Sequence, residues 1–406
     1  MMKRWKWFFM FLIISLAVVG CNDNEEIEEQ ETENRIVLTV MSSGGSDEIL
    51  KKIVEEQFPE VSLSFLSYPE EEFYTVMKMK LATGNGADFI SVQPGYAGSN
   101  ELYSLAAGGY LASLPENCTE VLGLDPQAKN LMKVDDRVYG ISNISLMLGV
   151  LYNKRIFDEE GIKVPACWEE FLDCCETLAK KKIQPIIFGG KDKREIQYGI
   201  YQIAVNRLYA SKPDYDQRLR ERKASFSDPN TWDHVLKTYF QLFEKGYIQE
   251  SCNYLRTSEA LEGFQRGEAA MLISNSMHAI PFLMSEELRG EYGFFPLPAN
   301  ERGGQQYVCK GSLGGLCVYS GSDYVKLCQQ ILMAYYQKAP GFLEYDDSFQ
   351  WAVDQEFWDL PSFPLCNQGW PNEVEIVMEK KVSEYLTHKI SSVSEITEAM
   401  QRELEK

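Results

Sequence analysis

The sequence predicts an α/β protein of two domains joined by a hinge, and three observations support this prediction. The 406 residues are enough for two or three domains, and 45% hydrophobic with 25% charged residues is typical of a globular chain. Short apolar runs with strand character alternate along the chain with amphipathic runs of helical period. Residues 141–152 form a β-rich apolar run that is too long for one ordinary strand, which fits a passage between domains.

The N-terminus has the pattern of a lipoprotein signal. Basic residues within 3–6 precede an apolar stretch, 7–19, that is too short to span a bilayer comfortably, and small residues then lead directly to Cys21. This pattern resembles a bacterial lipobox, so we expect cleavage before Cys21 and acylation of its thiol; an uncleaved anchor helix is the alternative. Residues 22–34 are almost all polar and largely acidic, so we expect them to form an extended tether.

Charge and cysteine content exclude some classes of partner and cofactor. The formal net charge of −20 argues against a nucleic-acid partner, because no basic surface is available to displace counterions from phosphates. Of ten cysteines, Cys21 is assigned to lipid, and the remaining odd number cannot all pair. We expect most of the others to act as small apolar residues, and one or two disulfides among them are the alternative. No Cys-x-x-Cys occurs and the three histidines lie far apart, so neither a metal site nor a cofactor is predicted.

The first part of the chain alternates strands and helices. The expected elements are strands at 35–41, 61–66 and 87–92 and helices at 48–58, 70–82 and within 102–114. A Ser/Gly loop follows the first strand, and its Ser42, Ser43 and Ser46 could offer hydroxyl and backbone N–H groups to a polar ligand. An ordinary turn with Ser46 as helix N-cap is the alternative.

The second part of the chain begins after the hinge. The expected elements are helices at 155–160, from 168, at 231–245, from 258 and at 323–338, strands at 183–188, 269–275, 292–298 and 311–319, and closing helices, the last from about 394. The loop after 183–188 lacks the spacing of a phosphate-binding loop. We expect it to form the edge of a ligand cleft, with Lys191, Asp192 and, in the next helix, Tyr198 as candidate ligand-binding residues.

Five motifs carry a resemblance to a known family. They are LATGNGADFISV at 81–92, YNKRIFDEEGIKVPACWEEF at 152–171, FQRGEAAM at 264–271, YGFFPLP at 292–298 and GSLGGLCVY at 311–319. In this order they resemble the extracellular solute-binding proteins of ABC transporters, in the branch that mostly binds sugars. Cys167 stands where the family usually has Thr, Ala87 where it has Pro, and Val92 where some sugar binders carry an aromatic residue.

The resemblance implies a particular division of the chain. The expected fold is the type II periplasmic-binding-protein-like fold, with two hinge-linked lobes whose central sheets are flanked by helices and close over ligand. The expected N-terminal lobe is 35–144 plus 277–322, and the expected C-terminal lobe is 145–276 plus 323–406. The chain would then cross between lobes near Ser145, Met277 and Asp323.

The resemblance adds candidates from strand ends, crossings and an aromatic-rich segment. Trp370 is favoured among the aromatics because its loop opens a closing helix, although core packing is the alternative for each aromatic. A structural histidine is the alternative for His278, and a strand bend for Gly314. The full set of candidate ligand-binding residues is Ser42, Ser43, Ser46, Gln93, Tyr96, Asn143, Ser145, Lys191, Asp192, Tyr198, Asn275, His278, Gly314, Trp351 and Trp370.

The implied function is capture of a sugar or oligosaccharide by hinge closure and its delivery to ABC permease subunits. The protein would act as a monomer, lipid-anchored at the outer face of the bacterial cytoplasmic membrane, and not as an enzyme. A lipid-anchored polysaccharide hydrolase is one alternative, but the sequence has no G-x-S-x-G, no H-E-x-x-H and no recognisable acid pair. A solute-binding sensor without a transport role is the other alternative.

Overall fold

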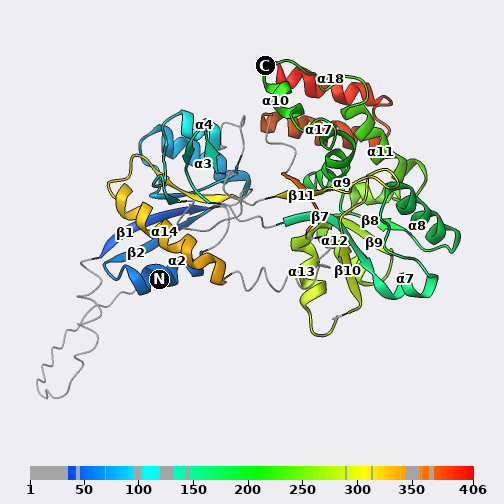
Figure 1. Ribbon diagram of the computed structural model, residues 1–406, viewed down its shortest axis with the longest axis horizontal. Coiled ribbons are helices and arrows are strands. Elements are labelled where there is room, and N and C mark those ends of the chain that lie inside the picture. The colour runs from blue at the N-terminus through cyan, green and yellow to red at the C-terminus, as the bar shows by residue number, and fades with distance from the viewer. Residues whose placement is uncertain are drawn as a thin grey trace, which may run out of the picture.

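The chain forms two α/β lobes, each with its own sheet. The computed structural model describes residues 35–42, 46–68, 70–94, 102–118, 132–141, 146–288, 290–311, 314–342, 357, 359–364 and 370–406. Figure 1 shows the N-terminal elements and α14 (Val325–Phe342) in one lobe, and the elements from β7 to β11 together with the C-terminal helices in the other. This is the two-lobe α/β architecture that the sequence predicts. Within the described ranges, no helix has the length and apolar character needed to cross a membrane.

The first lobe is built on a five-stranded sheet in the order β2-β1-β3-β12-β4. Strands β2 and β3 pair with β1 in parallel, whereas β12 runs antiparallel to both β3 and β4. The strands are β1 (Ile36–Ser42), β2 (Val61–Ser67), β3 (Phe89–Val92), β4 (Leu111–Ala112) and β12 (Gly315–Tyr319). A separate hairpin joins β5 (Lys133–Val134) to β6 (Arg137–Val138).

Both faces of this sheet are buried, because successive side chains of a strand point to opposite faces. Val40 and Phe89 lie in one apolar cluster, and their neighbours Met41 and Ile90 lie in the other. The first cluster includes side chains of α2 and α14, and the second includes side chains of α3 and α4. These three N-terminal helices are α2 (Glu48–Gln57), α3 (Glu70–Ala82) and α4 (Leu102–Ala107). The first lobe is therefore a sheet between two helical layers.

The second lobe has a six-stranded sheet organised around β7. Its order is β13-β11-β7-β9-β8, and β10 pairs with the part of β7 that β11 leaves open. Strands β9, β10 and β11 are antiparallel to β7, whereas β8 is parallel to β9. The strands are β7 (Leu146–Asn153), β8 (Ile186–Ile187), β9 (Met271–Asn275), β10 (Tyr292–Phe295), β11 (Val308–Gly311) and β13 (Ser362–Pro364).

Helices surround this second sheet and bury one large apolar core. On α8 the apolar positions recur at helical spacing, so Cys174, Cys175 and Leu178 face inward, and both cysteines act there as small apolar residues. The helices are α7 (Lys154–Glu160), α8 (Trp168–Lys180), α9 (Arg194–Ala204) with its π-helical extension η1 (Val205–Tyr209), α10 (Tyr215–Arg220), α11 (Trp232–Glu244), the 3-10 helix η2 (Glu250–Tyr254), α12 (Thr257–Gln265), α13 (Ser276–Met284), α17 (Asn372–Leu386) and α18 (Val393–Leu404).

The entry into the second lobe follows from local chemistry. The Asn153 side chain ends β7 and begins α7, because its Oδ1 accepts a hydrogen bond from the Ile156 backbone N–H at 3.1 Å. Gly161 then ends α7 in the left-handed conformation, with φ of 65°. These residues belong to the YNKRIFDEEG motif, so the predicted strand, short helix and glycine stop are confirmed.

The first crossing between lobes lies where the sequence predicts it, but the next two do not. Ile141 lies in the first-lobe core and Met147 in the second-lobe core. The expected return near residue 277 is wrong: α13 packs on β7, β9 and β10, and both β10 and β11 pair with β7. The chain returns only between Gly311 and Gly315, where β11 gives way to β12. The pairing of β10 and β11 with β7 thus keeps this part of the chain in the second lobe.

The third crossing also comes later than residue 323. Helix α14 belongs to the first lobe, since Cys328, Ile331 and Leu332 are buried in the core that β1 and α2 share. Phe357 packs against the second-lobe core, so the chain has crossed again by this residue. The predicted closing helices are confirmed, and Ser392 and Glu395 form a capping box at the start of α18.

Trp370 lies within the second-lobe core. The prediction that it stacks on a ligand is therefore wrong, because no part of its side chain is exposed. Its exposed fraction is 0%, and its ring lies 5.0 Å from Phe226, 5.4 Å from Trp232 and 6.3 Å from Tyr201. Edge-to-face aromatic packing of this kind stabilises the fold. Core packing, the alternative for the aromatic-rich segment, therefore accounts for this residue.

We expect Trp370→Ala to destabilise the second lobe by about 3–5 kcal/mol, because the substitution leaves a large cavity in a packed aromatic cluster. Urea unfolding followed by fluorescence and circular dichroism would measure the loss. Tyr254→Ala is a matched control, since the Tyr254 side chain is 61% exposed, and we expect a change within about 0.5 kcal/mol. A Trp370→Ala variant as stable as the parent would contradict the core assignment.

Candidate functional site

The first lobe places polar groups at one edge of its sheet. Strands β1 and β3 are parallel, so their carboxyl ends meet at the same edge, where Ser42 ends β1 and Gln93 follows β3. Strand β12 runs the other way and begins there, with Gly315 opposite Val92. Ligands of open α/β sheets bind outside the carboxyl ends of the strands. Ser42, Gln93 and the backbone at Gly314 therefore mark the candidate ligand-binding edge of this lobe.

Gly314 is required by its conformation and by its neighbour. Its φ is +101°, and a Cβ atom built on it would lie 2.6 Å from the Val92 carbonyl oxygen. No other residue fits this bend without moving β3 or β12. The bend places the backbone at Gly314 against the end of β3. Because glycine has no side chain, only backbone atoms of this residue lie at the edge.

The second lobe presents a matching edge. Strands β8 and β9 are parallel, so the residues that follow them lie on the same side: Lys191 and Asp192 after β8, and His278 after β9. Strand β7 is antiparallel to β9 and begins at this edge, with Leu148 opposite Asn275. Topology thus brings together candidates that lie more than 80 residues apart in the sequence.

Short connections require the two edges to face one another. Gly311 pairs with Leu146 at the start of β7, and Gly314 lies beside the end of β3. Three residues of extended chain span at most about 11 Å, which bounds the distance between Gly311 and Gly314. The first crossing, from Ile141 to Leu146, spans at most about 18 Å. The polar edge of one sheet therefore faces the polar edge of the other, and the two short connections run between them.

Asn275 and Ser276 fix the start of α13 at the second edge. The Asn275 Oδ1 atom caps the helix by accepting hydrogen bonds from the backbone N–H groups of Met277 at 2.9 Å and His278 at 3.2 Å. Ser276 Oγ accepts a hydrogen bond from the Met147 N–H at 2.9 Å, which joins α13 to the first residues of β7. Both side chains are buried. They hold the start of α13 against β7, and His278 follows them in the first turn of this helix.

His278 is the centre of a polar group that the sequence indicated only in part. Its Nδ1 atom lies 2.7 Å from Ser274 Oγ and 3.9 Å from Glu195 Oε1, and its ring meets the Tyr198 ring edge-on at 6.5 Å. The imidazole side chain keeps 30% exposure. Sequence reasoning singled out His278 and Tyr198 but missed Glu195 and Ser274. The Glu-x-x-Tyr spacing on α9, which puts both side chains on one helix face, was the available signal.

Burial makes this group electrically neutral near pH 7. Glu195 is 6% exposed, and burial raises the pKa of its carboxyl to about 8, although a hydrogen bond from Thr257 opposes the shift. Burial also lowers the pKa of His278. A protonated carboxyl, a neutral imidazole and a phenol are hydrogen-bonding groups without net charge. They suit a polar, uncharged ligand.

Asp192 has a structural task at this edge. Its Oδ2 atom accepts hydrogen bonds from the backbone N–H of Thr257 at 2.7 Å and from the Thr257 hydroxyl at 2.8 Å. The backbone hydrogen bond, more than the other contributions, lowers the pKa of this carboxyl. Asp192 thus joins the loop after β8 to the start of α12, and these bonds engage one carboxylate oxygen.

The remaining candidates divide into three groups. Ser46 lies exposed at the start of α2 but is not its N-cap: Asp47 is, with Oδ1 accepting from the N–H groups of Ile49 and Leu50. Trp370 lies in the core, as described above. The following candidates lie outside the described residues: Cys21, Ser43, Tyr96, Asn143, Ser145 and Trp351. In the described part of the chain, no three His, Cys, Asp or Glu side chains gather as metal ligands would.

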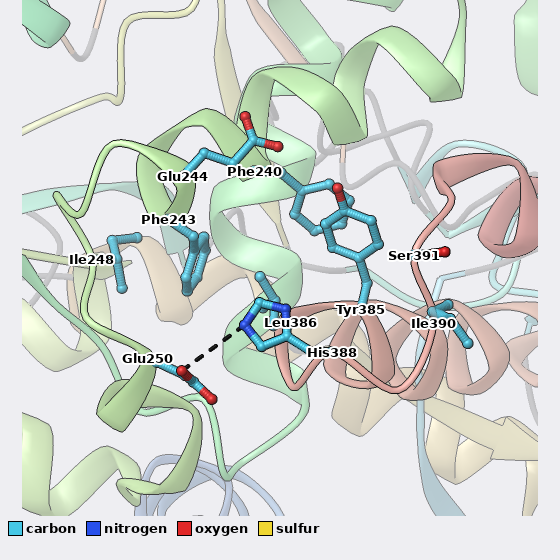
Figure 2. Close-up of a pocket in the computed structure, with 10 residues that line it drawn as sticks. All are labelled: Phe240, Phe243, Glu244, Ile248, Glu250, Tyr385, Leu386, His388, Ile390 and Ser391. Atoms are coloured by element: carbon cyan, nitrogen blue, oxygen red, sulfur yellow. Dashed lines mark ion pairs between the residues drawn. The ribbon is translucent and has the colours of Figure 1, made fainter.

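A separate apolar pocket lies within the second lobe. Figure 2 shows the Tyr385 ring lying against Phe240, with 4.1 Å between ring centroids, and His388 directed toward Glu250, with 3.9 Å between Nε2 and Oε2. The pocket has a volume of about 360 Å³ and is lined by α11, by Ile248 and the start of η2, and by the end of α17 and the turn that follows it. All ten lining residues belong to the second lobe, so this pocket is distinct from the paired sheet edges.

The fold and the paired edges agree with a comparison against known families. A family model of bacterial extracellular solute-binding proteins matches residues 42–332. This match covers more than half of the chain and includes strands of both sheets. The chain therefore belongs to the bacterial extracellular solute-binding protein family.

The chain is also similar to individual relatives and to solved structures of the same fold. The chain is 24% identical over 374 residues to the multiple sugar-binding protein of Streptococcus mutans, covering 88% of this chain and 81% of the relative. A chitin oligosaccharide binding protein of known structure matches with a TM-score of 0.72 at 21% identity, over 91% of this chain and 98% of that chain. RafE, known from Streptococcus pneumoniae, matches in its complex with raffinose with a TM-score of 0.70 at 17% identity, over 91% and 98%.

We expect Glu195 to make folding stability fall as pH rises from about 6.5 to 8.5. The folded pKa of about 8 lies above the ordinary value of 4.5, so the folded state binds more protons than the unfolded state in this window. Glu195→Gln should remove a decrease of about 2 kcal/mol, as measured by urea unfolding at each pH. Glu398→Gln, on an exposed face of α18, is the control. An unchanged slope in Glu195→Gln would show that Glu195 ionises freely in the folded protein.

Proposed function

We propose that this chain binds a neutral carbohydrate, a sugar or an oligosaccharide, between its two sheet edges and delivers it to the permease subunits of an ABC importer. The observation that carries the proposal is the pairing of two polar, largely uncharged strand-end clusters across two short connections. Hydroxyl, amide, phenol and imidazole groups can both donate and accept hydrogen bonds, as the hydroxyls of a sugar do.

Family membership supports the transport part of the proposal. The relative from Streptococcus mutans is named for binding multiple sugars, and RafE was solved with raffinose. Rotation about the two connections would bring the edges together over ligand, as in hinge closure of binding proteins. The protein would act as a monomer and release the sugar chemically unchanged. Hydrolysis would need a second carboxylate to work with the protonated Glu195, and Asp192 at the same edge is engaged with Thr257.

A ligand screen on the purified protein tests the proposal. A sugar present at about 100 times its Kd stabilises the bound state by about 2.7 kcal/mol, which raises Tm by a few degrees. We expect such a shift with one group of mono- or oligosaccharides. Chromatography of the sugar afterwards should show it intact, and a cleaved sugar would make the protein a hydrolase. No shift with any sugar would exclude a carbohydrate ligand.

His278→Ala separates the paired edges from any other sugar site. Losing one hydrogen bond of about 1 kcal/mol should weaken the affinity for the sugar about fivefold, with the Tm of the free protein little changed. His234→Ala, exposed on α11, is the matched control and should bind like the parent. Equal affinity in both variants would place the sugar away from His278.

We further propose that Cys21 carries a lipid that anchors the protein at the outer face of the cytoplasmic membrane. The small residues directly before Cys21 and the polar residues after it support this assignment. Cys21→Ser should move the protein from the membrane fraction to the soluble fraction of cells, because acyl chains supply roughly 0.8 kcal/mol per buried methylene. Continued membrane retention of Cys21→Ser would show that another segment forms the anchor.

A further inference from the structure

Two side-chain amides of α9 and its π-helical extension bind the strand that leads to the second crossing. Gln202 is 0% exposed. Its Nε2 group donates hydrogen bonds to the carbonyl oxygens of Tyr307 at 2.9 Å and of Leu297 at 3.2 Å. Its Oε1 atom accepts a hydrogen bond from the Cys309 N–H at 2.8 Å. One buried amide thus satisfies three backbone groups of the chain that enters and forms β11.

Asn206 binds the same stretch of chain one turn further along the helix. Its Oδ1 atom accepts a hydrogen bond from the Tyr307 N–H at 2.9 Å, and its Nδ2 group donates to the Tyr307 carbonyl oxygen at 2.9 Å. The Nδ2 group also donates to the Gln202 carbonyl oxygen at 3.0 Å, which ties the second amide to the turn that holds the first. We call Gln202 and Asn206 the amide clamp.

The amide clamp takes the place of a neighbouring strand. Among the described pairings, β7 meets β11 at the last two residues of β11, and β10 pairs with the next part of this edge of β7. On its other edge, the Val308 N–H donates to the Pro361 carbonyl oxygen at 3.0 Å, toward β13. Backbone groups of successive strand residues point to alternate edges. The N–H groups of Tyr307 and Cys309 therefore point away from β13, where the clamp binds them.

The helix departs from α geometry where the clamp forms. The Ala210 N–H donates to the Val205 carbonyl oxygen at 3.0 Å, five residues back, which is the π-helical pattern. Single π turns inside α-helices are rare and occur frequently at functional sites. Here the π turn includes Asn206, so the change in helix geometry falls on a residue that binds the strand.

The same helix carries side chains of the candidate site. Glu195 and Tyr198 lie beside His278 in the first turns of α9. Gln202 follows Tyr198 by four residues and Glu195 by seven, so helical spacing puts all three on one face. The rise from Tyr198 to Gln202 is about 6 Å. Helix α9, which packs on β7 and β9 (Figure 1), thus joins the candidate site to the clamp.

The position of β11 sets the position of the second crossing. Strand β11 ends at Gly311, where the link to the first lobe begins. A shift of β11 within the second lobe would move this link relative to α9. The hydrogen bonds of the amide clamp oppose such a shift, because their loss would leave buried backbone groups without these partners.

We propose that the amide clamp positions the second crossing for hinge closure, by holding β11 at a fixed place on the helix that carries Glu195 and Tyr198. The crossing and these candidate ligand-binding side chains then move as one body when the lobes close. Gln202 and Asn206 are positioning residues in this proposal, and neither has to contact the ligand. The inference rests on the proposed function, because closure over a ligand is part of that function.

Small-angle X-ray scattering of the free, purified protein tests the clamp without any ligand. The variants are Gln202→Met, which keeps the side-chain length but cannot donate a hydrogen bond, and Asn206→Ala at a half-buried position. We expect both to keep the circular dichroism spectrum of the parent and to spread the inter-lobe distances over a broader range. Tyr201→Phe is the matched control, since it removes from the same helix a buried hydrogen bond, at 2.9 Å to Glu375, that does not involve β11. We expect its scattering to match the parent.

Hydrogen exchange in the parent gives a reading that needs no variant. The amides of Tyr307 and Cys309 should exchange at least about a hundredfold more slowly than unprotected amides. Rapid exchange at both would overturn the proposal, because the clamp would then be open in solution. Inter-lobe distances in Gln202→Met and Asn206→Ala that match the parent would overturn it as well, since the amides would then have only a local structural role.

Calorimetric titration with raffinose, a neutral trisaccharide, adds a functional reading. We expect Gln202→Met to bind raffinose about tenfold more weakly than the parent, because only molecules with β11 in place close fully. Tyr201→Phe should bind it like the parent. Equal affinity in Gln202→Met and the parent would overturn the role of the clamp in closure. A parent that binds no raffinose would bear on the sugar of the proposed function, and the scattering of the free protein would still decide the clamp.

Discussion

The antiparallel pairing at the first residues of β7 is the constraint on which the rest of the structure depends. Leu146 and Met147 pair with β11, Leu148 pairs with Asn275 at the end of β9, and the Met147 N–H is also bound by Ser276. One short segment thereby fixes the first crossing, the second crossing and the start of α13. The functional edge of the second lobe is assembled around residues that come from three distant parts of the chain.

Much of the architecture was readable from local chemistry. Asn153 and Gly161 predict the limits of α7 because a side-chain cap and a left-handed glycine are local features. Burial of β1 and β3 on both faces of the sheet follows from their apolar composition in the same way. The assignment of residues 277–342 to lobes was not readable, since β10 and β11 as isolated strands suit either sheet. Their place was decided by pairing with β7, a contact more than 100 residues away.

The candidate site shows the same division. Residues at strand ends or directly after them, such as Asn275 and Gln93, could be singled out because strand ends are visible in the sequence. Glu195 was missed, since a glutamate at the start of a helix is ordinarily solvated; the Glu-x-x-Tyr spacing places it on the helix face of Tyr198, but only the fold buries it beside His278. Trp370 misled for the opposite reason: a tryptophan in an apparent loop suggests exposure, but Tyr201, Phe226 and Trp232 enclose it.

The link between Gly311 and Gly314, with two residues between them, has a mechanical consequence for the proposed hinge closure. A link this short permits rotation but almost no translation, so it acts as a pivot beside β7 and β3. Points near the pivot, such as Asn275 and Gln93, sweep short arcs when one lobe turns. The end of β8 lies two strand spacings from β7, about 10 Å further along the lever, so Lys191 travels further for the same angle. In the proposed closure, contacts near the pivot would therefore change little, whereas residues at the outer edge of the second lobe would move most.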